Sequence, residues 1–207
     1  MIKAISPSRL SKSKFKEFDF TGAFLDSFGK PEMKSRWLIY GYSGEGKTEL
    51  SMQLFKYFTQ FGKAVFYSKE QGYSSSLREC VVRNCIGDLH AKTAKIIVGG
   101  AFADLVSFLK KNKSVATVII DSVDYLELTI EQYKLLIETF PKKAFVFVAW
   151  KDGKRPKNAA ARAMEYMVDI KIEVKHFVAF PRSRYGGNLP FVIWEEGAKK
   201  HHAFLNI

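Results

Sequence analysis

The chain has 207 residues, of which 47% are hydrophobic, and its formal net charge is +12. This length suits one domain with a single core. The sequence has no apolar run of about 20 residues and no apolar signal core near its start, so we expect a cytoplasmic protein with no membrane role. The basic surplus favours polyanionic partners, because their binding releases counterions.

Residues 1–34 are predicted to form a basic arm followed by a short helix. The arm carries a lysine-rich piece at 11–16, and the apolar residues at 24–28 predict the helix. Residues 35–207 are predicted to form one domain, because no linker, internal repeat or low-complexity tract interrupts them.

From residue 36 onward, short apolar runs alternate with helical periods. Strands are predicted at 37–40, 64–67, 96–98, 118–120 and 145–148, and helices at 47–61, 77–85, 102–109 and 130–140. The helix at 77–85 would carry Cys80 and Cys85, too far apart for an unstrained bridge, and we expect both to be reduced. Strands that are apolar throughout have no solvent-exposed face, so they indicate a parallel sheet covered on both faces.

After residue 152 the pattern changes. Apolar residues alternate with charged ones from Val168 to Val174, which predicts a half-exposed strand. Gly186, Gly187 and Asn188 separate it from a second strand predicted at 191–194. The predicted fold is therefore α/β: a mostly parallel sheet flanked by helices and extended by C-terminal antiparallel strands.

Residues 41–48 read Gly-Tyr-Ser-Gly-Glu-Gly-Lys-Thr, between a predicted strand and a predicted helix. The glycines let backbone N–H groups point at phosphates, and the helix start adds partial positive charge. Lys47 would reach the terminal phosphates and Thr48 would hold Mg²⁺. The predicted nucleotide-binding residues are Gly41, Ser43, Gly44, Glu45, Gly46, Lys47, Thr48 and Glu49. The alternative is a glycine-rich turn that caps an ordinary helix.

Two acidic residues follow predicted strands. Asp121 ends the run at 118–120, and in phosphate-loop enzymes such an acid orients the Mg²⁺ shell. Glu70 follows the strand at 64–67 and would polarise an attacking water if the two strands are neighbours. A solvent-exposed acid at a strand end is the plainer interpretation of each. We predict Mg²⁺ at Thr48 and Asp121, with Glu70 catalytic.

Arg182 and Arg184 lie in the phrase Arg-Ser-Arg-Tyr-Gly-Gly, between the two predicted C-terminal strands. An arginine here is either a structural turn residue or a group that reaches a neighbouring subunit's nucleotide. In the second case it would stabilise charge on the transferring phosphoryl group. The residues alone leave both possibilities open.

Together these segments resemble the RecA superfamily, in particular the ATPase core of DnaB-like hexameric helicases and compact RecA-like ATPases of bacteria and phages. The resemblance covers roughly residue 37 to the C-terminus. The matching segments are 41–48, 67–70, 119–123, 168–170 and 182–186. The resemblance implies ATP, Mg²⁺ and a homo-oligomer, either a hexameric ring or a filament, with ATP between subunits. It also implies that Arg184 acts in trans as an arginine finger, with Arg182 as its companion.

One position departs from this family. After the strand at 145–148 these proteins usually place a Gln that senses the γ-phosphate, whereas this chain has Trp150, which donates a hydrogen bond but accepts none. The basic stretch 151–158 lies where RecA-like proteins carry a DNA-binding loop. Its predicted phosphate contacts are Lys151, Lys154, Arg155 and Lys157. The stretch has no aromatic ladder for base stacking, and a solvated loop is the alternative.

The leading hypothesis is an ATP hydrolase that resembles RecA and DnaB and acts on single-stranded DNA in replication or recombination. A KaiC-like regulatory or assembly ATPase, with a protein partner and no DNA role, is the alternative from another class. A small-molecule phosphotransferase is a weaker one, because such kinases need a lid of arginines, and the chain shows no such cluster besides Arg182 and Arg184. Hydrolysis stimulated by added oligonucleotide would separate the first two.

Overall fold

The computed structural model describes residues 2, 4–89 and 91–201. Residues 1 and 3 of the predicted arm, and 90 and 202–207 of the predicted domain, lie outside the described residues. The strands are β1 (Arg36–Gly41), β2 (Lys63–Ser68), β3 (Ala94–Val98), β4 (Val115–Asp121), β5 (Ala144–Asp152), β6 (Arg155–Pro156), β7 (Ile170–Lys175), β8 (Val178–Ser183) and β9 (Phe191–Val192). The helices are α1 (Pro7–Ser11), α2 (Gly22–Phe28), α3 (Lys47–Phe58), α4 (Ser75–Arg83), α5 (Phe102–Lys111), α6 (Ile130–Thr139), α7 (Ala159–Met167) and α8 (Glu195–Lys199).

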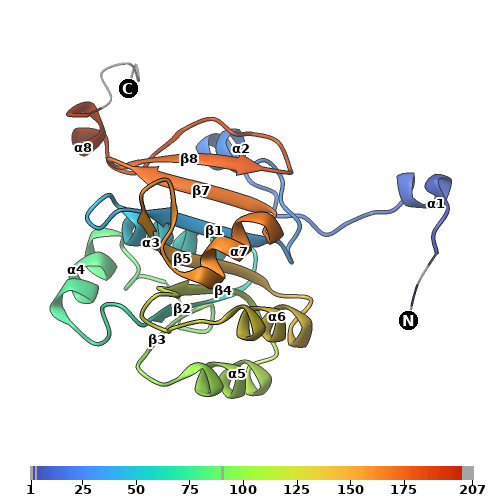
Figure 1. The fold of residues 1–207 in the computed structure, drawn as a ribbon, viewed down its shortest axis with the longest axis horizontal. Coiled ribbons are helices and arrows are strands. Elements are labelled where there is room, and N and C mark those ends of the chain that lie inside the picture. Colours follow the sequence, from blue (N-terminus) through green and yellow to red (C-terminus); the bar gives the residue numbers. More distant parts are fainter. Residues whose placement is uncertain (1, 3, 90, 202–207) are drawn as a thin grey trace.

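In this described part, the strands form a nine-stranded sheet in the order β3-β2-β4-β5-β1-β7-β8-β9, with β6 paired to β5 (Figure 1). β1 is parallel to β5 and β7, β4 to β2 and β5, and β2 to β3. β8 and β9 continue the sheet in antiparallel pairing. The predicted mostly parallel sheet with an antiparallel C-terminal extension is thus confirmed.

Helices cover both faces of the sheet, and the buried hydrophobic residues form two clusters. One cluster includes Phe28, Phe55 and Leu77, from α2, α3 and α4. The other includes Leu105 of α5 and Leu136 of α6, together with residues of α7. The carboxyl ends of the parallel strands meet at one edge, which in such sheets is where ligands bind.

Residues 18–28 belong to the same core as the sheet. Phe18 and Phe28 are fully buried, and the ring of Phe18 lies 4.9 Å from that of Phe58 in α3. The short helix predicted at 24–28 is confirmed as α2. α1 has no buried residue and stands apart from the body at the end of an extended segment (Figure 1). Of the predicted N-terminal region, the part around α1 is therefore the part that stands away from the domain.

β8 differs from the prediction, which treats the segment before Gly186 as a connection. β8 pairs along the whole of β7. The turn between them uses His176 and Phe177, both with positive φ, 47° and 61°. A turn of this kind usually carries Gly or Asn, so the sequence pattern does not predict it here. The strand predicted at 191–194 is shorter, since β9 covers Phe191–Val192.

Two helical features also differ from the prediction. The sequence patterns do not predict α7. Its N-cap is Asn158, whose side chain accepts the Ala160 and Ala161 N–H groups at 2.7 and 3.2 Å. α4 ends at Arg83, so Cys85 lies beyond the helix that contains Cys80; both thiols are free. None of the helices in the described residues has the length and apolar character needed to cross a bilayer.

Candidate functional site

The loop between β1 and α3 has the backbone conformation that its glycines predict. A Cβ on Gly41 would lie 2.5 Å from the Val174 carbonyl oxygen of β7, so only glycine fits there. Gly44 and Gly46 have φ values of 80° and 102°, which other residues rarely adopt. α3 begins at Lys47, so the motif lies between a strand and a helix, as a phosphate-binding loop requires.

The first turn of α3 has backbone N–H groups available for an anion. Gly46 is the N-cap, and no side chain in the described residues caps this end. Such N–H groups attract phosphates. The side chain of Lys47 is buried, and its Nζ donates to the Tyr42 carbonyl oxygen at 2.8 Å. Burial lowers the pKa of Lys47. The loop therefore gathers amide donors and one cation at the carboxyl end of β1.

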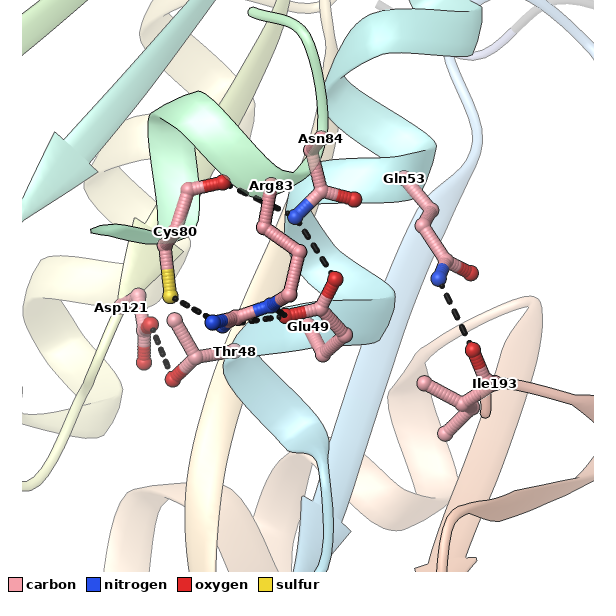
Figure 2. A network of polar contacts seen from close by, with 8 residues as sticks. All are labelled: Thr48, Glu49, Gln53, Cys80, Arg83, Asn84, Asp121 and Ile193. Carbon is pink, nitrogen blue, oxygen red and sulfur yellow. Dashed lines mark hydrogen bonds and ion pairs between the residues drawn. The ribbon is translucent and has the colours of Figure 1, made fainter. Parts of the chain in front are cut away.

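Asp121 contacts this loop from a strand two places away. β5 separates β1 from β4, and Asp121 is the last residue of β4. The Thr48 hydroxyl donates to Asp121 Oδ2 at 2.9 Å (Figure 2). Burial raises the pKa of Asp121 to about 7 and the charge of Glu70 adds to the rise, while Thr48 and Lys47 oppose it.

The Thr48–Asp121 pair fits a bound Mg²⁺. Asp121 Oδ1 is buried and has no hydrogen-bond partner among the described residues. A buried oxygen is costly to leave unsatisfied. Mg²⁺ is usually held by one or two protein oxygens, several waters and substrate phosphates. Thr48 and Asp121 would supply the protein oxygens of such a shell.

Glu70 lies beside Asp121, because β2 and β4 are neighbours in the sheet. The backbone N–H groups of Lys69 and Glu70 donate to the Asp121 carbonyl oxygen at 2.6 and 3.0 Å. The Glu70 side chain lines the same cleft as the phosphate-binding loop. Its Oε2 accepts a hydrogen bond from Trp150 Nε1 at 3.2 Å. Segments far apart in the sequence thus meet at this edge.

The cleft over the loop has a volume of about 620 Å³ and reaches an aromatic wall that the sequence does not reveal. The rings of Phe177 and Trp194 lie edge to face, 4.9 Å apart. A Cβ on Gly197 of α8 would lie 2.4 and 2.5 Å from these rings, so α8 packs tightly against them. Gln53 of α3 donates to the Ile193 carbonyl oxygen at 3.0 Å (Figure 2). The size suits a ligand such as a nucleotide.

Glu49, a predicted nucleotide contact, joins α3 to α4. Arg83 donates to Glu49 Oε2 through Nε at 3.0 Å and Nη2 at 2.8 Å, and Asn84 Nδ2 donates to Oε1 at 2.7 Å (Figure 2). Arg83 Nη2 also lies 3.3 Å from Cys80 Sγ. A nucleotide contact by the Glu49 carboxylate would compete with these bonds. Arg83 and Cys80 line the cleft but belong to no local motif.

Glu45 and Ser43 take different places in the loop. Glu45 Oε2 accepts the Tyr42 N–H at 3.2 Å, and its carbonyl oxygen accepts the Phe177 N–H at 3.0 Å. Its Oε1 lies 3.8 Å from His176 Nδ1. Glu45 therefore stabilises the loop and bonds it to the turn before β8. Ser43 instead lines the cleft.

Arg182 and Arg184 lie at the opposite edge of the sheet. β8 runs antiparallel to β7 and places Arg182 opposite Lys171. The Arg184 N–H donates to the Asp169 carbonyl oxygen at 3.1 Å, and the Asp169 N–H donates to that of Arg36 at 2.9 Å. Arg184 is thus level with the first residue of β1, while the phosphate-binding loop follows its last. At about 3.3 Å per residue, the two ends of β1 are about 17 Å apart.

The segment that carries the arginines is fixed on α2. Ser183 Oγ donates to the Phe28 carbonyl oxygen at 2.9 Å, and the Asn188 N–H donates to that of Ser27 at 2.9 Å. The side chain of Arg184 is 65% exposed, with Nη1 3.7 Å from Asp169 Oδ1. An arginine side chain does not span the sheet, so any nucleotide it contacts would belong to another copy of the chain.

The predicted nucleic-acid contacts lie on the β5–β6 hairpin, at the same edge as the phosphate-binding loop. Lys151 is in β5, Lys154 in the turn, Arg155 in β6, and Lys157 follows β6. The Tyr42 hydroxyl donates to the carbonyl oxygen of Gly153 in the turn at 2.9 Å, so the hairpin is bonded to the phosphate-binding loop.

Two of these four cations are paired with acids. Lys151 forms an ion pair with Glu173, and Arg155 Nε lies 3.3 Å from Glu165 Oε2. Lys154 is exposed and makes no ion pair with the described residues. The positive charge available to a phosphate is therefore smaller than the sequence predicts.

Aromatic side chains from other segments lie next to the hairpin, although the stretch 151–158 has none of its own. A second cleft, of about 480 Å³, is lined by Tyr42, Tyr125 and Trp150 together with Lys151 and Lys157. The rings of Tyr125 and Trp150 lie edge to face, 5.3 Å apart. The fold thus supplies rings that the local sequence lacks. Ser43 and Glu70 line both this cleft and the cleft over the phosphate-binding loop.

Comparisons with protein-family models and with curated protein sequences find no match to this chain. Support for a function comes from the fold and from the residues of the site. These define an α/β protein with a mostly parallel sheet, antiparallel C-terminal strands and a phosphate-binding-loop sequence between β1 and α3.

Proposed function

We propose that this chain is a RecA-like P-loop ATPase that hydrolyses ATP with Mg²⁺ and acts on single-stranded DNA in the cytoplasm. The observation that carries the proposal is the hydrogen bond from Thr48 to Asp121, with Glu70 bonded through its backbone to the same aspartate. Three segments of the chain bring a phosphate cradle, a metal-holding pair and a candidate base to one edge of the sheet.

Each residue has a separate role in this proposal. Loop amides and Lys47 bind the phosphates, while Thr48 and Asp121 hold the ion. When bound, Mg²⁺ neutralises charge on the phosphate oxygens. Glu70 accepts a proton from, or orients, the attacking water, and the rings of Phe177 and Trp194 provide the apolar lining of the cleft against which a base would lie.

We further propose a homo-oligomer with ATP between subunits. The support is the separation of the two edges: the phosphate-binding loop is at one end of β1, and Arg184 is level with the other end. A neighbouring copy that presents this edge to the cleft would bring Arg184 to the transferring phosphoryl group, where a positive charge stabilises the transition state. Arg182, opposite Lys171 on β7, would accompany it.

The support for DNA as partner is the net charge of +12 and the place of the basic hairpin beside the phosphate-binding loop. Phosphate contacts need only flexible cations, and Lys154 and Lys157 are both exposed. Three aromatic rings near the hairpin add surfaces on which bases stack.

The test is the rate of ATP hydrolysis with and without a single-stranded oligonucleotide, alongside the molecular mass in solution with and without nucleotide. We expect single-stranded DNA to raise turnover and nucleotide to raise the mass. Hydrolysis that ignores the oligonucleotide would refute the DNA role and favour the protein-directed ATPase. Asp121→Asn is the control that reports any contaminating ATPase.

A further inference from the structure

The indole of Trp150 is fixed by groups around the second cleft. The backbone N–H of Trp150 donates to Asp124 Oδ2 at 2.7 Å. The ring of Tyr125 meets the indole edge to face at 5.3 Å and 87°. Lys157 Nζ lies over the indole, 5.3 Å from the ring centre. Contacts from the segment after β4 and from the basic hairpin therefore hold this residue of β5 and its ring in place.

The one polar atom of the indole is directed at Glu70. Trp150 Nε1 donates to Glu70 Oε2 at 3.2 Å. An indole N–H only donates and a carboxylate only accepts, so this bond has one direction. The backbone of Glu70 is separately held, because its N–H donates to the Asp121 carbonyl oxygen at 3.0 Å. One bond fixes the main chain and the other fixes one carboxylate oxygen, which leaves the second oxygen to meet a water.

We propose that Trp150 is a positioning residue that holds the Glu70 carboxylate in its orientation for hydrolysis. This inference rests on the proposed ATPase function, and it adds a residue that acts through Glu70. The geometry also gives the basic hairpin a route to the site, because Lys157 lies over the same indole whose N–H holds Glu70.

Trp150→Phe removes the N–H and keeps an aromatic ring near Tyr125 and Lys157. We expect kcat to fall about 10- to 100-fold with little change in KM for ATP, because misplacing a catalytic group affects the chemical step. Trp37→Phe is the matched control: Trp37 is fully buried, and its indole N–H donates to Ser35 Oγ at 2.8 Å. This variant also loses one indole hydrogen bond and some packing, so it should be less stable with kcat unchanged.

A double-mutant cycle separates positioning from packing. If Trp150 acts through Glu70, Trp150→Phe should lower kcat in the parent but have no further effect in Glu70→Gln. An unchanged kcat for Trp150→Phe, or equal losses in both backgrounds, overturns the proposal.

The contact itself can be measured without any activity. In a ¹H–¹⁵N spectrum, the indole resonance that disappears in Trp150→Phe should move in Glu70→Ala, whereas the indole resonance of Trp37 should stay. A stationary Trp150 resonance refutes the hydrogen bond and the proposal with it. If that resonance moves but the parent hydrolyses no ATP, the proposed function fails and the positioning role fails with it, while the contact stands.

Discussion

The two edges of the sheet differ in what they place together. At the carboxyl edge, Lys47 and Glu70 line one cleft, and Thr48 of the same cleft donates to the buried carboxylate of Asp121. At the amino edge, Arg182 and Arg184 lie exposed on a segment fixed to α2. One edge has the groups that we propose hold a phosphate and a metal, and the other has cations about 17 Å away, at the opposite end of β1.

In the homo-oligomer that we propose, one copy would supply the phosphate-binding loop and its neighbour the arginine. Phosphate transfer needs both a cradle and a charge that stabilises the transition state. Because one protomer carries these two parts at opposite ends of β1, the site that we propose would be complete only with two protomers.

The largest expected effect is that of Arg184→Ala. Turnover should fall about 1,000-fold, within the range for an arginine finger, while nucleotide affinity remains intact. The measurements are kcat and equilibrium binding of a fluorescent ATP analogue. Arg78→Ala, which removes an exposed arginine paired with Glu79 on α4, is the control and should leave both unchanged.

A mixing experiment shows whether Arg184 acts across subunits. Lys47→Ala should be inactive alone, yet its intact Arg184 can complete the site of an Arg184→Ala neighbour. The mixture should therefore exceed the summed activities of the two variants. A mixture no more active than this sum would place both residues in one chain's own site and contradict the comparison of the two edges.

The second prediction concerns pH and the carboxyl edge. Because the pKa of Asp121 is raised to about 7, this carboxyl is increasingly protonated below that pH. Metal ligands must be deprotonated, so affinity for Mg²⁺-ATP should fall by up to about tenfold for each pH unit below 7. Calorimetric titration between pH 6 and 8 checks this, and Asp121→Asn should bind weakly with a flatter profile.

Without Mg²⁺ the same carboxyl makes stability depend on pH in the opposite sense. Its pKa is higher in the folded chain than the ordinary value of 3.8. The folded state therefore binds the proton more tightly, and this contribution to stability, full below pH 3.8, is lost as pH rises through 7. Urea unfolding in EDTA should show the parent losing more stability than Asp121→Asn between pH 5 and pH 8.

The smallest expected effect is that of the hairpin cations, and it is read from the salt dependence of single-strand binding. Replacing Lys154, Arg155 and Lys157 with Glu should reduce the slope of log affinity against log salt. Since Arg155 is paired with Glu165, we expect a loss equivalent to two phosphate contacts, about 1.4 at about 0.7 per contact for single strands.

The matched control makes the same change in charge on α5 and just after it. Lys110, Lys111 and Lys113 are exposed there, away from the site, and their replacement with Glu should leave the slope near that of the parent. If the hairpin variant and the control have equal slopes, DNA binds elsewhere, with the lysine-rich arm at 11–16 as the next candidate.

Local patterns were sufficient for most of the fold. The apolar runs are the buried parallel strands, because a strand covered on both faces must be apolar along its whole length. The phosphate-binding loop is also readable, because its glycines, Lys47 and Thr48 are adjacent in the chain and their roles follow from that spacing. The sequence patterns did not predict β8, because the turn before it is made by His176 and Phe177 rather than by glycine.

The tertiary structure decided what distant residues do to one another. Strand order brought Asp121 to Thr48 and Glu70 to Trp150, pairs separated by 73 and 80 positions in the chain. It also paired Lys151 and Arg155 with acids, and it placed Arg184 at the far edge. Sequence by itself determined most of the helices and strands and the phosphate-binding motif, because these depend on neighbouring residues. Which side chains meet depends on the order of strands in the sheet, and spacing along the chain does not encode that order.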